Sequence, residues 1–343
     1  MMLIAPFFVS GQTDQHRRGL KDYYKGYFPV GVAVTPRQLA DSAQKNFILK
    51  HFNSLTAENA MKMAPIHPKE NSFFWTDADA IVNFAQQYKL KLRGHTLCWH
   101  NQTPRWMFYD QAGNLVSKEV LLQRLKAHIY AVVGRYKGKV YAWDVVNEAV
   151  ADEPDRMFRN SLWYQICGED YIFKAFQYAH EADPKAILFY NDYNTEYPRK
   201  REHIYQLLKK MRDAGIPVHA VGLQAHWSIT NPSKQELEST IMRYASLGIK
   251  IQITELDVSI YAKDSDSASG FTPEREQQQA AQYLSIFKAF REHRKQIHGV
   301  TFWNLSDRYS WLDNFPVRGR KNYPLLFDAE LQPKKAYWEV VNF

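Results

Sequence analysis

The chain of 343 residues is 45% hydrophobic and 15% aromatic, which is typical of a folded globular protein and excludes a disordered chain. Its formal net charge of +8 permits an acidic partner, but basic residues occur in small groups and no nucleic-acid-binding motif is present. The two cysteines, Cys98 and Cys167, exclude a disulfide framework and leave one bridge between them open. No run reaches the roughly 18 apolar residues that a membrane span needs.

The beginning of the chain differs from the rest. Residues 1–11 are apolar and a polar stretch follows, as at the end of a signal peptide, but the basic residues before the apolar core are missing and the core is short. We interpret residues 1–16 as an N-terminal segment of signal-peptide type and expect a secreted or periplasmic protein, with a cytoplasmic protein as the alternative. Residues 17–343 are expected to form one domain.

Short apolar runs alternate along this domain with segments of helical periodicity. Eight runs predict strands at residues 30–34, 52–56, 92–98, 140–146, 186–190, 220–223, 250–254 and 300–303. The segments between them predict helices at residues 78–88, 118–136, 171–180, 201–214, 234–247 and 273–293. Thr272 and Pro273 indicate an N-cap followed by proline at the first helical position, and Gly215 indicates a helix stop before a strand.

Eight strand and helix units in one domain predict the α/β class and a closed (β/α)8 TIM barrel. The active site of this fold lies at the C-terminal ends of the strands, so the residues that follow each strand are the candidates. They are Glu58, Asn59, Lys62, His95, Trp99, His100, Gln102, Asn147, Glu148, Asn191, Asp192, Tyr193, Asn194, Gln224, His226, Glu255, Asp257, Trp303, Asp307 and Trp311. Polar side chains mixed with tryptophans predict a sugar ligand, because its hydroxyls need donors and acceptors and its ring faces stack on indole.

Two glutamates stand out within this set. Glu148 and Glu255 each end an apolar, strand-like run, and they come from different strands. A single glutamate in such a place is more often a helix-cap partner or part of a surface ion pair. Two carboxylates that face each other at strand ends are what glycoside cleavage requires, so the pair predicts a glycoside hydrolase.

Six motifs carry a resemblance to a known family. They are TAENAMK (56–62), GHTLCWHNQ (94–102), WDVVNE (143–148), GLQAH (222–226), ITELD (253–257) and WNLSDRYSW (303–311). They span almost the whole chain in the order of the family, although any one of them alone would be a weak signal. By these motifs the chain resembles the family 10 glycoside hydrolases, endo-1,4-β-xylanases, and residues 17–343 are expected to be its catalytic barrel.

The resemblance implies a retaining double displacement on β-1,4-xylosidic bonds. Glu148 matches the general acid/base and Glu255 the nucleophile, and retention requires their carboxyls to lie about 5 to 5.5 Å apart. We expect Glu148 to be protonated in the resting enzyme, because the charge of Glu255 and apolar neighbours disfavour a second anion. Asn147 is expected to bind the sugar 2-hydroxyl. His226, oriented by Asp257, is expected to keep Glu255 ionised.

The resemblance also assigns substrate-binding positions. Seven residues match positions that line the two sugar subsites on the non-reducing side of the cut: Asn59, Lys62, His95, Trp99, Asn147, Gln224 and His226. The strand-end residues Glu58 and Gln102 are also expected to bind substrate. Trp303 and Trp311 match tryptophans that wall the site, and Tyr193 and Asn194 match positions toward the reducing end.

The sequence departs from the family at two positions. Asn304 stands where the family usually has glycine. Asparagine tolerates left-handed backbone, so the turn is expected to survive while the side chain narrows the cleft. Cys98 replaces an aliphatic residue and is expected to be buried with little effect.

Other functions remain open at this stage. An inert carbohydrate-binding barrel and an enzyme for cellulose or mannan are the alternatives to a xylanase. His95 and His100 are read as hydrogen-bonded structural residues, with metal binding as the rival interpretation. We expect no metal or cofactor, xylan or xylooligosaccharides as substrate, no nucleic acid partner, no membrane span and a monomer.

Overall fold

The computed structural model describes residues 18–267 and 270–343, so the predicted N-terminal segment lies outside the described residues. Eight parallel strands form a closed barrel in the order β6-β5-β4-β3-β2-β1-β9-β8, and pairing of β6 with β8 closes it. The strands are β1 (Val30–Val34), β2 (Ser54–Ala57), β3 (Lys91–Trp99), β4 (Ala142–Asn147), β5 (Ile187–Asp192), β6 (Ala220–Leu223), β8 (Lys250–Ser259) and β9 (Ile297–Phe302). The predicted single-domain (β/α)8 barrel is confirmed.

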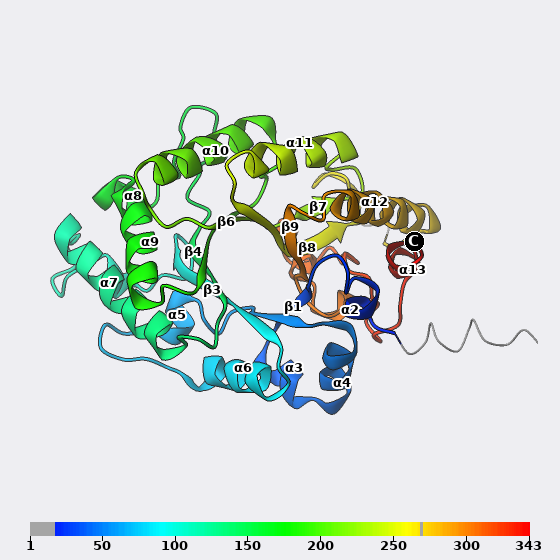
Figure 1. Ribbon diagram of the computed structural model, residues 1–343, viewed down its shortest axis with the longest axis horizontal. Coiled ribbons are helices and arrows are strands. Elements are labelled where there is room, and N and C mark those ends of the chain that lie inside the picture. Colours follow the sequence, from blue (N-terminus) through cyan, green and yellow to red (C-terminus); the bar gives the residue numbers. More distant parts are fainter. Residues whose placement is uncertain (1–17, 268–269) are drawn as a thin grey trace, which may run out of the picture.

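Helices surround the barrel on its outside (Figure 1). The long ones are α6 (Thr76–Gln87), α7 (Lys118–Arg135), α9 (Asp170–Ala182), α10 (Pro198–Asp213), α11 (Lys234–Ala245) and α12 (Pro273–Glu292). Because helices cover the outer face and side chains fill the interior, barrel strands are buried on both sides, and every residue of β1, β2, β4 and β6 is buried. The predicted cap of α12 is present, since the Thr272 side chain accepts a hydrogen bond from the Arg275 amide at 3.3 Å.

The sequence missed the shorter helices and one short strand. The helices are α2 (Leu20–Tyr23), α3 (Pro36–Ala40), α4 (Ser42–His51), α5 (Met63–Ile66), α8 (Leu162–Cys167) and α13 (Lys335–Val341). The strand β7 (His226–Ser228) pairs with the end of β8, where His226 lies opposite Asp257. β8 itself continues to Ser259, beyond the predicted residues 250–254. The predicted strand ended before Glu255 because polar side chains are typical of loops, whereas Glu255 and Asp257 are part of β8.

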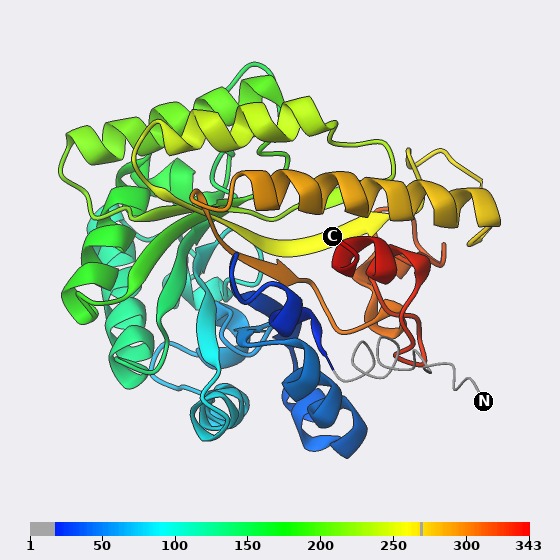
Figure 2. The same ribbon diagram turned by 45° about the vertical axis from the view of Figure 1, so that its right-hand side comes forward.

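The two ends of the described chain meet at one side of the barrel. Helix α13 packs against α12 (Figure 2), and the Tyr24 hydroxyl, just after α2, donates a hydrogen bond to the Val340 carbonyl at 2.5 Å. Cys98 and Cys167 are buried free thiols. In the described part of the chain, no helix combines the length and apolar character needed to cross a membrane.

Gly94 in β3 allows the barrel strands to pack around Trp143. A Cβ atom at position 94 would lie 2.1 Å from Cε3 of the Trp143 ring. Trp143 is fully buried, so its ring has no open space into which it could move. Glycine at position 94 is therefore required by the neighbouring strand.

We expect Gly94→Ala to lower the free energy of unfolding by about 3 kcal/mol, the upper part of the range for overpacked cores. Urea denaturation monitored by tryptophan fluorescence measures this change. Gly134→Ala is the matched control, because an added Cβ there meets nothing within 4 Å and alanine favours the helix by about 0.5 to 1 kcal/mol. Equal effects of both substitutions would contradict this account of the packing.

Candidate active site

Glu148 directly follows β4 and Glu255 lies in the C-terminal half of β8, and β5 and β6 separate these two strands in the barrel. Glu148 directly follows β4 with a φ of +56°, a conformation that is uncommon for residues other than glycine. Its exposed fraction is 9%, and that of Glu255 is 4%. Both carboxyls are therefore largely removed from water, and their surroundings decide their protonation.

Side-chain amides connect the two carboxyls. Asn147 donates from Nδ2 to Oε1 of Glu148 at 3.2 Å. Asn191 donates from Nδ2 both to Oδ1 of Asn147 and to Oε1 of Glu255, at 2.8 Å each. Gln224 donates from Nε2 to Oε1 of Glu148 at 2.9 Å. The carboxyls are thus held in one hydrogen-bonded network, and Asn191, predicted at a strand end without an assigned role, belongs to it.

His226 contacts the carboxyls of both Glu255 and Asp257. Its Nε2 lies 3.3 Å from Oε2 of Glu255, and its Nδ1 lies 3.0 Å from Oδ2 of Asp257. Trp311 donates from Nε1 to the same Asp257 oxygen at 2.8 Å. Burial opposes the positive charge of His226, but Asp257 and Glu255 outweigh it and raise the pKa of His226 to about 10. At neutral pH the ring is therefore a cation that donates from both nitrogens.

This arrangement keeps Glu255 ionised. Burial would raise the pKa of Glu255, but the electrostatic effect of His95, the hydrogen bond from His226 and the charge of Lys62 outweigh it and lower that pKa to about 2. A buried carboxylate surrounded by cations is an available nucleophile at ordinary pH.

Glu148 has the opposite environment. Burial raises its pKa, and the negative charge of Asp192 adds to this effect. The hydrogen bond that Trp99 donates from Nε1 to Oε2 of Glu148, at 2.8 Å, and the bond from Gln224 offset it only in part. The two carboxyls therefore differ in protonation, as an acid and a nucleophile must.

A second group of predicted residues lies beside Trp99 and Trp303. The Lys62 ammonium lies 5.0 Å from the ring centroid of Trp99 and 5.8 Å from that of Trp303. It donates to Oδ1 of Asn59 at 3.0 Å, and Asn59 donates from Nδ2 to Oε1 of Glu58 at 3.3 Å. Trp99 is half-buried and Trp303 is buried, and charged and amide groups beside indole rings are suited to a sugar ring and its hydroxyls.

Asn304, at which the sequence departs from the family that it resembles, contacts this second group. Its φ is +132°, so the turn does keep backbone that favours glycine. Its side chain is 3% exposed. It accepts from Nε2 of Gln38 at 2.7 Å and donates to Oε2 of Glu58 at 3.2 Å. The amide thus links Glu58 to α3.

Two buried charged residues inside the barrel, Arg93 and Asp144, were not predicted from the sequence, whereas His95, which contacts Asp144, was. Arg93 lies 2.5 Å from Oδ1 of Asp144, and Nδ1 of His95 lies 2.9 Å from Oδ2 of the same carboxylate. His95 Nδ1 also lies 3.8 Å from Oε1 of Glu255. Arg93 and Asp144 interrupt apolar runs, which was the available signal.

The remaining predicted residues have fewer contacts with the carboxyl network. The Tyr193 hydroxyl contacts Asp152 and accepts from Arg159. Gln102 is exposed, and its carbonyl accepts from the Ala64 amide. Asn194 has a φ of +53°, and its carbonyl accepts from the Tyr197 amide.

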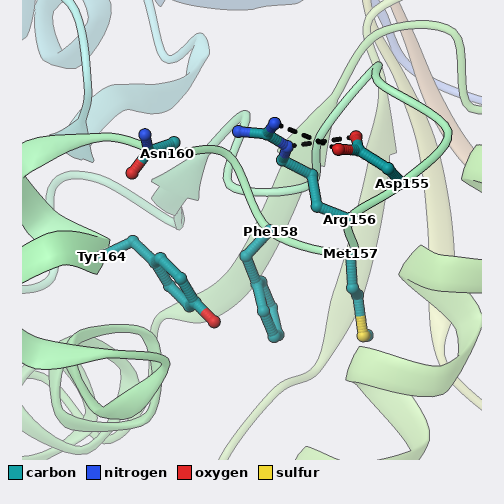
Figure 3. A pocket seen from close by; sticks show the side chains of 6 residues that line it. All are labelled: Asp155, Arg156, Met157, Phe158, Asn160 and Tyr164. Carbon is teal, nitrogen blue, oxygen red and sulfur yellow. Dashed lines mark hydrogen bonds and ion pairs between the residues drawn. The ribbon is translucent and has the colours of Figure 1, made fainter.

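None of the described residues forms a group of three or more His, Cys, Asp or Glu side chains that could hold a metal ion. A surface hollow of about 330 Å³ lies beside the loop after β4 and is lined by residues outside the predicted site (Figure 3). They are Asp155, Arg156, Met157, Phe158, Asn160 and Tyr164. The strand-end residues, and not this hollow, bring two unequal carboxyls together.

Comparison with known proteins agrees with this geometry. The chain is 51% identical to the endo-1,4-beta-xylanase of Geobacillus stearothermophilus, over 94% of this chain and 98% of the relative. It is 50% identical to endo-1,4-beta-xylanase B of Paenibacillus barcinonensis, over 93% of this chain and 96% of the relative. The crystal structure of xylanase XynB from the same species, in complex with a conduramine derivative, superposes with a TM-score of 0.92 and covers 94% of this chain and 98% of that one.

A family model extends the likeness to nearly the whole described chain. The model described as glycosyl hydrolase family 10 matches residues 19–343. The chain therefore belongs to glycosyl hydrolase family 10, the family that its motifs predicted.

Proposed function

We propose that this protein is an endo-1,4-β-xylanase in which Glu148 is the general acid/base and Glu255 the nucleophile. The observation that carries the assignment is the contrast between the two linked carboxyls: the pKa of Glu148 is raised, and that of Glu255 is lowered to about 2. Double displacement with a glutamate acid/base and a glutamate nucleophile is the general mechanism of the family.

The first step forms a glycosyl ester. A Glu255 oxygen attacks the anomeric carbon while Glu148 gives its proton to the leaving oxygen, so the glycosidic C–O bond breaks as the ester bond forms. Asn191 and His226 hold the nucleophile through its two oxygens. Asn191 Nδ2 donates to both Asn147 and Glu255, whereas Asn147 Nδ2 donates, among the described residues, only to Glu148. Asn147 therefore keeps an amide N–H for the sugar 2-hydroxyl, which favours it over Asn191.

The second step releases the sugar. Glu148, now a carboxylate, takes a proton from water, and the water oxygen attacks the anomeric carbon as the ester bond to Glu255 breaks. Each step inverts the anomeric centre, so the product keeps the β configuration of the substrate.

The assignment of xylan or xylooligosaccharides as substrate rests on the relatives named above, and one structural neighbour, 45% identical with a TM-score of 0.92, is a mutant structure in complex with xylotriose. Glu58, Asn59, Lys62 and Gln224 supply groups for sugar hydroxyls. Reducing-sugar release from xylan, compared with that from carboxymethylcellulose and mannan, separates the xylanase from the alternative enzymes, and no release from any of them would favour an inert binding barrel.

We also propose that the protein acts as an exported monomer.

We expect Glu148→Ala to reduce xylan hydrolysis by roughly 10²- to 10⁴-fold, the usual worth of general acid/base catalysis. With an aryl β-xylobioside that needs no acid, azide should restore turnover and give a β-glycosyl azide. Azide with Glu255→Ala should give the α-glycosyl azide, because a single displacement inverts the centre. NMR of the products distinguishes the β-glycosyl azide from the α-glycosyl azide. Near-normal xylan hydrolysis by either variant, or exchanged azide configurations, would contradict the roles.

We expect His226→Asn to move the acid limb of the kcat/KM profile to higher pH. The reason is that loss of the His226 cation and its hydrogen bond raises the pKa of Glu255 from about 2, and the ionised form is the one that attacks. Initial rates between pH 3 and 9 measure the shift. The basic limb, which we assign to Glu148, is the internal control, and an unmoved acid limb would rule out the proposed role of His226.

Removal of the Asn304 amide should weaken substrate binding more than it slows the chemical step. Asn304→Gly removes the hydrogen bond that Asn304 donates to the Glu58 carboxyl, and a hydrogen bond contributes about 1 kcal/mol, or more where the acceptor is ionised. We expect KM for xylotriose to rise about tenfold with kcat changed less than about twofold. A lower kcat at constant KM would place Asn304 in the chemical step instead.

A further inference from the structure

Beside Glu148 lies a cluster of four charged side chains that the reaction described above does not use. The cluster consists of Asp152, Arg159, Asp192 and Lys200. The Lys200 ammonium lies 2.8 Å from Oδ1 of Asp152 and 2.9 Å from Oδ1 of Asp192. Arg159 donates to Oδ2 of Asp152 at 3.0 Å. The side chain of Asp192 is fully buried and that of Lys200 is 5% exposed, so their charges are poorly screened by water.

The cluster carries two negative and two positive charges. The Asp192 carboxylate receives hydrogen bonds from Lys200, from the Tyr193 amide at 2.9 Å and from the Tyr190 hydroxyl at 2.5 Å. Burial raises the pKa of Asp192, whereas the charge of Lys200 and the hydrogen bonds from Tyr190 and Lys200 act against this rise and favour the ionised form. The four charges therefore balance, and removal of any one of them leaves a net charge next to Glu148.

Tyr190 links Asp192 to the backbone that follows Glu148. Its hydroxyl donates to Asp192 and accepts from the amides of Ala149 and Val150 at 3.1 and 3.0 Å. These two amides come directly after Glu148, whose φ of +56° needs support from its surroundings. Asp192 thereby fixes the hydroxyl that holds this turn.

Arg159 makes the second connection. It donates from Nε to the Glu148 carbonyl at 2.9 Å and from a terminal nitrogen to the Tyr193 hydroxyl at 2.7 Å. The Lys200 ammonium lies 3.7 Å from the Tyr193 ring centroid. The cluster therefore contacts the main chain at the Glu148 carbonyl and, through Tyr190, at the two amides that follow it. It also contacts the tyrosine expected toward the reducing end of the substrate.

The other charged groups around the Glu148 carboxyl come from three elements. His100, just after β3, lies 3.9 Å from Oε2 of Glu148; burial, and next to it the charge of Arg159, lower the pKa of His100 to about 4, so it is neutral near pH 6. Lys62, just before α5, and Glu255, on β8, act on Glu148 with opposite signs. Against this background, Asp192 is the largest charged influence on Glu148 after burial itself.

We propose that Asp192 and Lys200 are positioning residues for the acid/base: their pairing holds the turn at Glu148 and balances the charge beside its carboxyl. This inference rests on the proposed role of Glu148. It assigns a function to residues from β5 and α10 that take no part in the bond-making and bond-breaking steps described above. A purely structural ion pair would influence stability without setting the protonation of Glu148.

Charge-changing variants test the proposal, because the two partners should act in opposite directions. Asp192→Asn leaves an excess positive charge, which favours the Glu148 anion, so the basic limb of kcat/KM should move to lower pH. Lys200→Met leaves an excess negative charge, so the same limb should move to higher pH. We expect each shift to be on the order of one pH unit, as for charges within a few ångströms.

A double variant and a surface control complete the experiment. The double variant, Asp192→Asn with Lys200→Met, restores the charge balance even if each single variant is less stable. Its basic limb should therefore differ from that of the wild type by less than about a third of a single-variant shift. Lys209→Met, on the same helix, removes an exposed lysine paired with Asp213 and should leave the limb in place. Thermal unfolding of each variant shows which ones are folded at the assay temperature.

The outcomes separate this inference from the proposed function. If the wild-type protein hydrolyses xylan and Glu148→Ala does not, but both single variants keep the wild-type limb, the positioning role is overturned and the xylanase assignment stands. Shifts of the two single variants in the same direction would also overturn it. An inactive wild-type protein would instead reject the proposed function itself.

Discussion

The site depends on keeping two buried carboxyls in one hydrogen-bonded network while giving them different protonation states. Asn147 and Asn191 link Glu148 to Glu255 through their amides, but neither amide carries a charge. The difference in protonation therefore comes from the charged groups near each carboxyl. His226 contacts Glu255, and Asp192 is the strongest charge acting on Glu148. Exchange of these neighbouring charges would exchange the protonation states of the two carboxyls.

The barrel makes this separation possible. β4 and β8 bring the glutamates to the same end of the fold, while β5 and β6 between them supply the linking and charged groups. Buried polar groups destabilise a protein unless they are paired, and the buried aspartates of this site have different partners. Asp257 pairs with His226, Asp144 pairs with Arg93 and His95, and Asp192 pairs with Lys200. The catalytic carboxyls gain their properties from these neighbouring pairs.

The sequence predicted the barrel and the strand-end residues because the C-terminal ends of parallel strands must meet in this fold. It could not predict the charged neighbours. Lys200 lies on α10 and Arg159 in the loop before α8, and no periodicity or motif relates either residue to Glu148. Polar residues within strands misled the prediction, as the early end given to β8 at residue 254 shows. Contacts across elements, which depend on three-dimensional packing, were the part that the sequence left open.

The central claim, that Glu255 forms the covalent bond to the sugar, has one direct test. A 2-deoxy-2-fluoro-β-xylobioside with a good leaving group slows both steps but still permits the first, so the glycosyl enzyme accumulates. Mass spectrometry after trypsin digestion should find the added sugar on the peptide of residues 251–263, which contains Glu255. Label on the peptide of residues 140–156, which contains Glu148, or inactivation without any covalent sugar, would contradict the account.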